Sequence, residues 1–139
     1  MKKNLGFFFK FHHFGLAIKN SKVKINFYKN LGYTISREYI DKFQRVRLRL
    51  CYSKLGPTIE LVSPMDKKSP IINYIRKFDE VFYHTCYEIN DLRAVEYLKE
   101  NFDSKCVLAP RPAEIFGYKK ISFYYVKNLG LIEILENVR

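Results

Sequence analysis

Two stretches of the chain repeat one another, and this repeat limits the possible folds more than any other feature. Each stretch begins with a histidine in a strand-like run, His13 in the first and His84 in the second, and ends with a glutamate in an apolar run, Glu60 and Glu133. The separation is 47 positions in the first stretch and 49 in the second. We therefore expect two similar modules, each of which brings one histidine and one glutamate to the junction between them.

The apolar pattern predicts the same order of elements, β-α-β-β-β, in both modules. The first module is expected to contain strands over residues 11–18, 34–40, 45–50 and 58–63, and a helix with the apolar face Val23, Phe27 and Leu31. The second module is expected to contain strands over residues 81–89, 105–108, 119–126 and 131–135, and a helix that Asp91 caps. A short helix is predicted over residues 69–77, and two prolines predict a loop at residues 110–112.

These elements place the protein in the α+β class, as two βαβββ modules whose sheet is mostly antiparallel with helices outside. A length of 139 residues suits one compact domain. We expect a single domain over residues 1–139, with module 1 at about 11–66, a connector at about 67–80 and module 2 at about 81–139.

Charge and cysteine content restrict the partners and the compartment. The chain carries 25 Lys and Arg against 14 Asp and Glu, a net charge of +11, but the basic residues are dispersed, so nucleic acid is not an expected partner. The three cysteines form no Cys-x-x-Cys pair and are interpreted as reduced thiols of a cytoplasmic protein. No apolar stretch approaches a membrane-spanning length, so we expect no membrane partner either.

The two glutamates are the strongest candidates for a functional site. Strand alternation places each of them among apolar neighbours, where a carboxylate is costly unless it is paired or bound to a metal. The alternative is that both strand faces are solvated at one end. His13 has the alternative of a core histidine bonded to a backbone carbonyl, and His12 is expected to point to the opposite face. Two histidines and two glutamates suit Zn²⁺, Co²⁺, Ni²⁺, Mn²⁺ or Fe²⁺, and they leave coordination positions open for substrate.

Several motifs resemble the vicinal oxygen chelate (glyoxalase and bleomycin resistance) superfamily, which includes glyoxalase I and methylmalonyl-CoA epimerase. The run from His13 to Ile18 resembles the opening His-x-Gly-x-Ala strand of the superfamily, and Ile132-Glu133 resembles its terminal ligand. The segment from Ile59 to Pro64, followed by Asp66 and Ser69-Pro70-Ile71, is most similar to the epimerase branch.

The resemblance implies that the two βαβββ modules form a curved mixed sheet around a metal site, and that His13, Glu60, His84 and Glu133 are ligands of a divalent metal ion there. It also implies epimerisation of a 2-substituted malonyl-type CoA thioester through an enolate. Glu133 is the preferred base and Glu60 is the second candidate. Leu48 stands near the place where some epimerases carry a further acid, which leaves the identity of the proton-transfer groups open.

The expected partners are an acyl-CoA substrate and a second copy of the chain in a homodimer. Lys119, Lys120 and Arg111 are candidates to hold the phosphates of the coenzyme, and the alternative for them is ordinary solvated loop charge. The alternative functions are isomerisation of the glyoxalase I type and metal-free binding of a small molecule.

Overall fold

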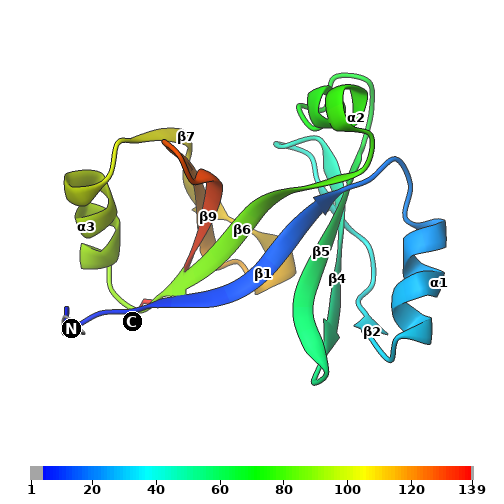
Figure 1. Ribbon diagram of the computed structural model, residues 1–139, viewed down its shortest axis with the longest axis horizontal. Coiled ribbons are helices and arrows are strands. Elements are labelled where there is room, and N and C mark those ends of the chain that lie inside the picture. Colours follow the sequence, from blue (N-terminus) through cyan, green and yellow to red (C-terminus); the bar gives the residue numbers. More distant parts are fainter. Residues whose placement is uncertain (1–4, 139) are drawn as a thin grey trace. The chain divides into compact units, whose positions relative to one another are not determined.

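The structure of the protein, a computed structural model, describes residues 5–138 and divides into two compact units. The central unit comprises residues 13–83, and the terminal unit comprises the described residues up to His12 and from His84 onward. The strands β1 (Phe9–Ala17) and β6 (Val81–Ile89) each pass from one unit into the other along the chain (Figure 1).

The sheet of the central unit has the strand order β2-β4-β5-β1, with β3 added to β4. Its strands beyond β1 are β2 (Thr34–Ile35), β3 (Tyr39–Asp41), β4 (Val46–Ser53) and β5 (Gly56–Pro64). β1 and β5 are parallel, whereas β4 pairs antiparallel with each of its partners. The helices of this unit are α1 (Lys22–Asn30) and α2 (Ile72–Phe78).

The sheet of the terminal unit has the strand order β6-β9-β8-β7. Its strands beyond β6 are β7 (Ser104–Pro112), β8 (Lys120–Val126) and β9 (Gly130–Glu136). β6 and β9 are parallel, and the remaining pairs are antiparallel. The helix α3 (Arg93–Asn101) and a 3-10 turn at Glu114–Phe116 complete the unit. Each module therefore begins with a strand and a helix and ends with a strand parallel to the first, which confirms the predicted α+β class.

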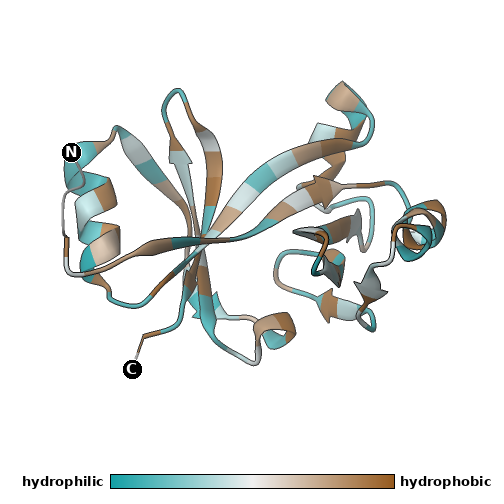
Figure 2. Cartoon of the chain, turned by 60° about the horizontal axis from the view of Figure 1, so that its bottom comes forward, coloured by the Kyte–Doolittle hydropathy of each residue, from teal (hydrophilic) through white to brown (hydrophobic). Residues whose placement is uncertain are grey.

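Each unit packs its long helix against one face of its own sheet (Figure 1). In the terminal unit Ala94 and Leu98 of α3 pack with Ile89, Val126 and Ile134. In the central unit α1 contributes a different pair, Ile25 and Tyr28, to a core that contains the following strand residues: Ile18, Cys51, Ile59 and Leu61. Hydrophobic and hydrophilic residues are interleaved along the long strands (Figure 2), as expected when the two faces of a sheet have different surroundings.

The structure corrects three local predictions. The predicted strand 34–40 is divided into β2 and β3, because the Ser36 hydroxyl accepts a hydrogen bond from Leu50 N at 2.9 Å between them. The prolines at 110 and 112 lie within β7 rather than in a loop; β7 is an edge strand, and its register shifts near these residues. The connector helix begins at Ile72, three residues after Ser69.

The predicted apolar face of α1 is also wrong. Val23, Phe27 and Leu31 are all exposed, and the residues that pack on the sheet are Ile25 and Tyr28. Both sets have helical spacing, so spacing alone could not select between them.

No helix among residues 5–138 is both long enough and apolar enough to span a bilayer.

Candidate metal centre

The central unit holds one histidine and one glutamate side by side on neighbouring parallel strands. Gly15 of β1 lies opposite Glu60 of β5, which places Glu60 next to His13, two residues earlier in β1. His13 Nε2 and Glu60 Oε1 are 3.6 Å apart, and both side chains are buried. The sheet face that carries this pair is the face opposite α1.

The terminal unit repeats this arrangement. Cys86 of β6 lies opposite Glu133 of β9, which places Glu133 next to His84, two residues earlier in β6. His84 Nε2 and Glu133 Oε1 are 3.5 Å apart, and both side chains are again buried. The two units therefore present equivalent histidine–glutamate pairs at the same strand register.

The spacing within each pair fits the donors of a metal ion. At 3.5–3.6 Å, the nitrogen–oxygen separation is longer than the roughly 2.7–3.2 Å of an N–H···O hydrogen bond. Two donors at about 2.1 Å from one ion with a near-tetrahedral angle between them would be about 3.4 Å apart. Imidazole nitrogen and carboxylate oxygen are also the donor types that divalent transition ions accept. Each pair thus fits two ligands of such an ion.

The surroundings of the glutamates are apolar, as the alternation predicted. Strand pairing places Glu60 between Gly15 and Leu50, with Val62 two residues further along the same face. Glu133 lies between Cys86 and Phe123. A carboxylate in such surroundings is unfavourable without a cation or donors. Both glutamates are only 3% exposed, which excludes the alternative that both strand faces are solvated at one end.

Leu48 occupies a place on this same face of the central sheet. It pairs with Val62, two residues beyond Glu60, and it is buried. Its side chain has no group that can exchange a proton. The part of the central face that surrounds Glu60 is therefore hydrophobic at this position.

Phe123 is a site residue that the sequence analysis did not single out. Its ring meets the His84 ring edge-on, with 5.2 Å between centroids and 86° between planes. Such a contact restricts the rotation of the imidazole. Strand alternation over residues 119–126 places Phe123 on one face with Ile121, but only the pairing of Phe123 with Glu133 shows that this face carries the glutamate.

His12 contacts the 3-10 turn of the terminal unit. Its ring meets the Phe116 ring edge-on at 5.4 Å, and Phe116 packs against the apolar cluster that contains Cys86 and Phe123. The expectation that His12 points to the face of β1 opposite His13 stays a prediction.

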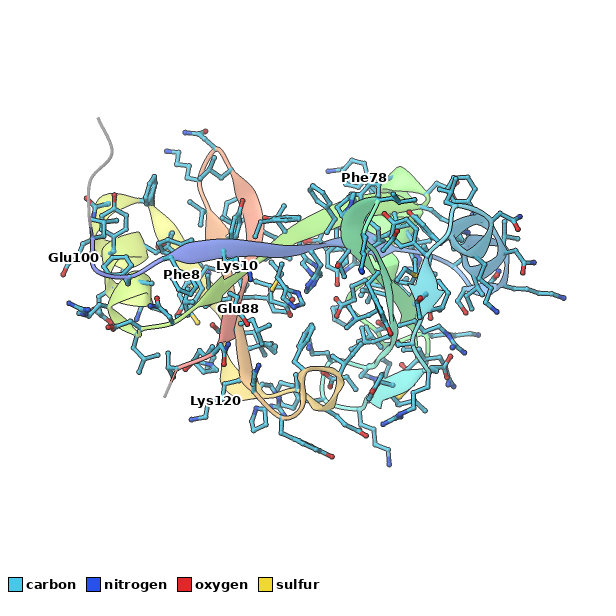
Figure 3. All side chains as sticks on the ribbon, turned by 90° about the horizontal axis from the view of Figure 1, so that it is seen from below. Phe8, Lys10, Phe78, Glu88, Glu100 and Lys120 are labelled. Carbon is cyan, nitrogen blue, oxygen red and sulfur yellow. The ribbon has the colours of Figure 1, made fainter. Side chains whose placement is uncertain are left out.

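The three cationic candidates lie together at one end of the terminal sheet. Lys119 and Lys120 are exposed where β8 begins, and Pro112 of β7 pairs with Lys120. The side chain of Lys120 is labelled in Figure 3. Arg111 is adjacent to Pro112 and partly exposed. These positive charges are accessible to an anionic ligand, and their exposure also agrees with the alternative of solvated charge.

Asp66 holds the chain where it leaves β5. Its carboxylate accepts a hydrogen bond from Arg45 Nε at 3.0 Å and another from Lys68 N at 2.9 Å. The Arg45 hydrogen bond is the main cause that lowers the pKa of Asp66 below its ordinary value. The Asp66 residue of the connector motif thus has a structural role within the central unit.

Comparison with known proteins identifies the family. The model of the Glyoxalase/Bleomycin resistance protein/Dioxygenase superfamily matches residues 12–125, and the chain belongs to this superfamily. No curated protein matches the chain significantly.

Solved structures agree on the fold at low sequence identity. Methylmalonyl-CoA epimerase from Mycobacterium tuberculosis has a TM-score of 0.76 and 23% identity, over 91% of this chain and 87% of that one. A hypothetical protein from Bacillus halodurans has a TM-score of 0.80 and 22% identity, over 93% and 94% of the two chains. A Streptomyces coelicolor methylmalonyl-CoA epimerase variant in complex with 2-nitronate-propionyl-CoA has a TM-score of 0.75 and 18% identity, over 91% and 96%. At these identities the likeness establishes the fold alone.

Proposed function

We propose that the protein is a metal-dependent epimerase of a 2-substituted malonyl-type CoA thioester, and that its two modules act as one domain. In this proposal His13, Glu60, His84 and Glu133 are the ligands of one divalent ion. The observation that carries it is the pair of equivalent, buried histidine–glutamate arrangements at donor spacing. Membership of the superfamily and the epimerases among the structural neighbours support it.

A divalent ion in this centre would supply positive charge beside the thioester and carboxylate oxygens, where negative charge develops as the proton leaves. The protein must then remove the proton from the carbon between the two carbonyl groups and return a proton to the opposite face. We assign the removal to the carboxylate of Glu133, with Glu60 as the second candidate. Leu48 is excluded from proton transfer by its side chain.

The rest of the substrate is assigned by charge. The phosphates of a CoA tail carry the negative charge that Lys119, Lys120 and Arg111 complement. We propose further that the enzyme is a cytoplasmic homodimer. The cytoplasmic assignment is supported by its three cysteines, which are all free thiols.

The test is proton exchange. CoA thioesters of 2-substituted malonates are incubated in D₂O with the protein and each of Co²⁺, Ni²⁺, Mn²⁺ and Zn²⁺, and deuterium at the acidic carbon is measured by mass spectrometry. We expect metal-dependent exchange that a chelator abolishes. At matched metal occupancy, Glu133→Gln is expected to lose at least about 100-fold of the exchange rate.

Two controls make the assignment specific. Glu88→Gln changes a glutamate of β6 that belongs to neither pair, and it should exchange at the wild-type rate. Glu60→Gln at matched occupancy shows whether Glu60 is the base instead. Wild-type rates in both Glu133→Gln and Glu60→Gln would refute the mechanism, and turnover of a hemithioacetal without thioester exchange would replace the function with isomerisation of the glyoxalase I type.

A further inference from the structure

The outer side of α1 carries an exposed apolar ridge. Val23, Phe27 and Leu31 recur every four residues, and their exposed fractions are 68%, 56% and 51%. The buried side of the same helix is formed by Ile25 and Tyr28. The ridge is therefore not the sheet-packing side of the helix, and within the central unit it faces outward.

The charge around this ridge has one sign. The sequence of α1 is Lys-Val-Lys-Ile-Asn-Phe-Tyr-Lys-Asn, which contains no acid. Lys24 is paired with Glu80, but neither Lys22 nor Lys29 has an acidic partner among residues 5–138. Exposed apolar side chains beside uncompensated lysines form a surface that matches an apolar layer bordered by anions.

A second exposed pair of one lysine and one apolar residue lies near the C-terminal end of α1. The turn between β4 and β5 carries Lys54 and Leu55, and Leu55 is 87% exposed. Tyr33, just after α1, donates a hydrogen bond from its hydroxyl to Pro57 O at 2.7 Å, which ties the end of the helix to this hairpin. Figure 1 shows the hairpin tip and the β2-proximal end of α1 at this end of the unit.

We infer that this surface, the α1 ridge with the β4–β5 tip, docks the protein peripherally on an anionic phospholipid surface. Charge selects this occupant over a second copy of the chain at this surface, because α1 contains no acid and its exposed lysines, Lys22 and Lys29, would meet the same lysines of the other copy. The exposure of the ridge agrees, since the apolar face of a helix inserts into the headgroup boundary of a bilayer without a matching groove. The inference departs from the expectation of no membrane partner, which rested on the lack of an apolar stretch of membrane-spanning length.

The test is sedimentation with vesicles at about 0.1 M salt. Wild-type protein should sediment with phosphatidylglycerol vesicles and remain in the supernatant with phosphatidylcholine vesicles. Phe27→Gln/Leu31→Gln should weaken partitioning at least about tenfold, because two apolar side chains no longer insert. Lys54→Gln/Leu55→Gln should weaken it as well. All four residues are exposed, so these variants should fold.

The matched control is the other lysine–leucine hairpin tip. Lys127→Gln/Leu129→Gln alters the turn between β8 and β9 in the terminal unit, where Leu129 is 66% exposed. This variant should sediment like the wild type. The inference is overturned if the wild-type protein does not sediment with the anionic vesicles, or if the control variant loses as much vesicle binding as Phe27→Gln/Leu31→Gln. It is also overturned if the wild type binds no lipid and instead forms a dimer that Phe27→Gln/Leu31→Gln abolishes.

Discussion

Thermal stabilisation by metal tests whether the two histidine–glutamate pairs act as one centre. The perturbation is addition of Co²⁺ to metal-free protein, at about 100 times the dissociation constant. Binding to the folded state alone then stabilises it by about 2.7 kcal/mol. For 139 residues the unfolding entropy is about 0.3 kcal/mol per kelvin, from about 2.1 cal/mol/K per residue. The melting temperature should therefore rise by about 9 °C.

Single ligand variants turn this shift into a test of sharing. If one ion uses all four ligands, His13→Ala and His84→Ala should each remove most of the shift, although their residues belong to different units. The double variant should then lose little more than either single variant. If each unit bound its own ion, each single variant would keep about half of the shift.

The assay is circular dichroism melting with Co²⁺ and with a chelator, for each variant. Comparison of each variant with its own metal-free form cancels the destabilisation that the replacement itself causes. His12→Ala is the matched control and should keep the full shift. A shared four-ligand centre is refuted if His13→Ala and His84→Ala each keep half of the metal-dependent rise in melting temperature, or if either variant keeps all of it.

Three further predictions concern substrate binding and pH. Replacement of Lys119 and Lys120 by Ala should raise KM for a CoA thioester by roughly tenfold and leave kcat nearly unchanged, as measured by steady-state kinetics. The folded state lowers the pKa of Asp66 below its ordinary value of 3.8, so its ionised carboxylate stabilises the fold above that pH, and the stabilisation is lost as the pH falls through the lowered pKa. In urea unfolding, the stability advantage of wild type over Asp66→Asn should therefore shrink below about pH 4. Burial raises the pKa of the Cys51 thiol from 9.0 to about 11, so the unfolded state loses this proton at a lower pH than the folded state, and the free energy of unfolding should fall as the pH rises from 9.0 to about 11. In urea unfolding, Cys51→Ala should lack this pH dependence.

Much of the candidate site was predictable because it lies on strands. A period of two residues fixes which side chains share a face, so the neighbours of Glu60 and Glu133 could be named from the sequence. β6 was predicted with its observed bounds, Val81–Ile89. The sequence did not predict the parallel pairing of β1 with β5 and of β6 with β9, which places each glutamate beside the histidine of its module. Pairing between strands that are distant in sequence is decided by tertiary contacts.

The errors occurred where the local pattern allows two answers. α1 has two apolar stripes at helical spacing, and only packing on the sheet selects Ile25 and Tyr28 over the outer ridge. The prolines of β7 are compatible with a strand because β7 pairs on one side only, with β8, within the terminal sheet. Edge position is a property of the assembled sheet and cannot be read from a tripeptide.

The two pairs are alike in their donors, and their strand neighbours differ. The residue opposite Glu60 is Gly15, which has no side chain, whereas Glu133 has Cys86 on one side and Phe123 on the other. The position opposite Glu60 on β1 therefore carries no side chain, whereas both strand neighbours of Glu133 carry one. Epimerisation uses two groups, one that takes the proton and one that returns a proton to the opposite face, and the two glutamates meet this need with different neighbours. A Gly15→Cys variant would make the first pair resemble the second. If the substrate approaches Glu60 at the position of Gly15, this variant should lose thioester exchange while it keeps the metal-dependent rise in melting temperature. Loss of both would mean that Gly15 is needed for the metal centre itself, and retention of both would mean that the substrate does not use this position.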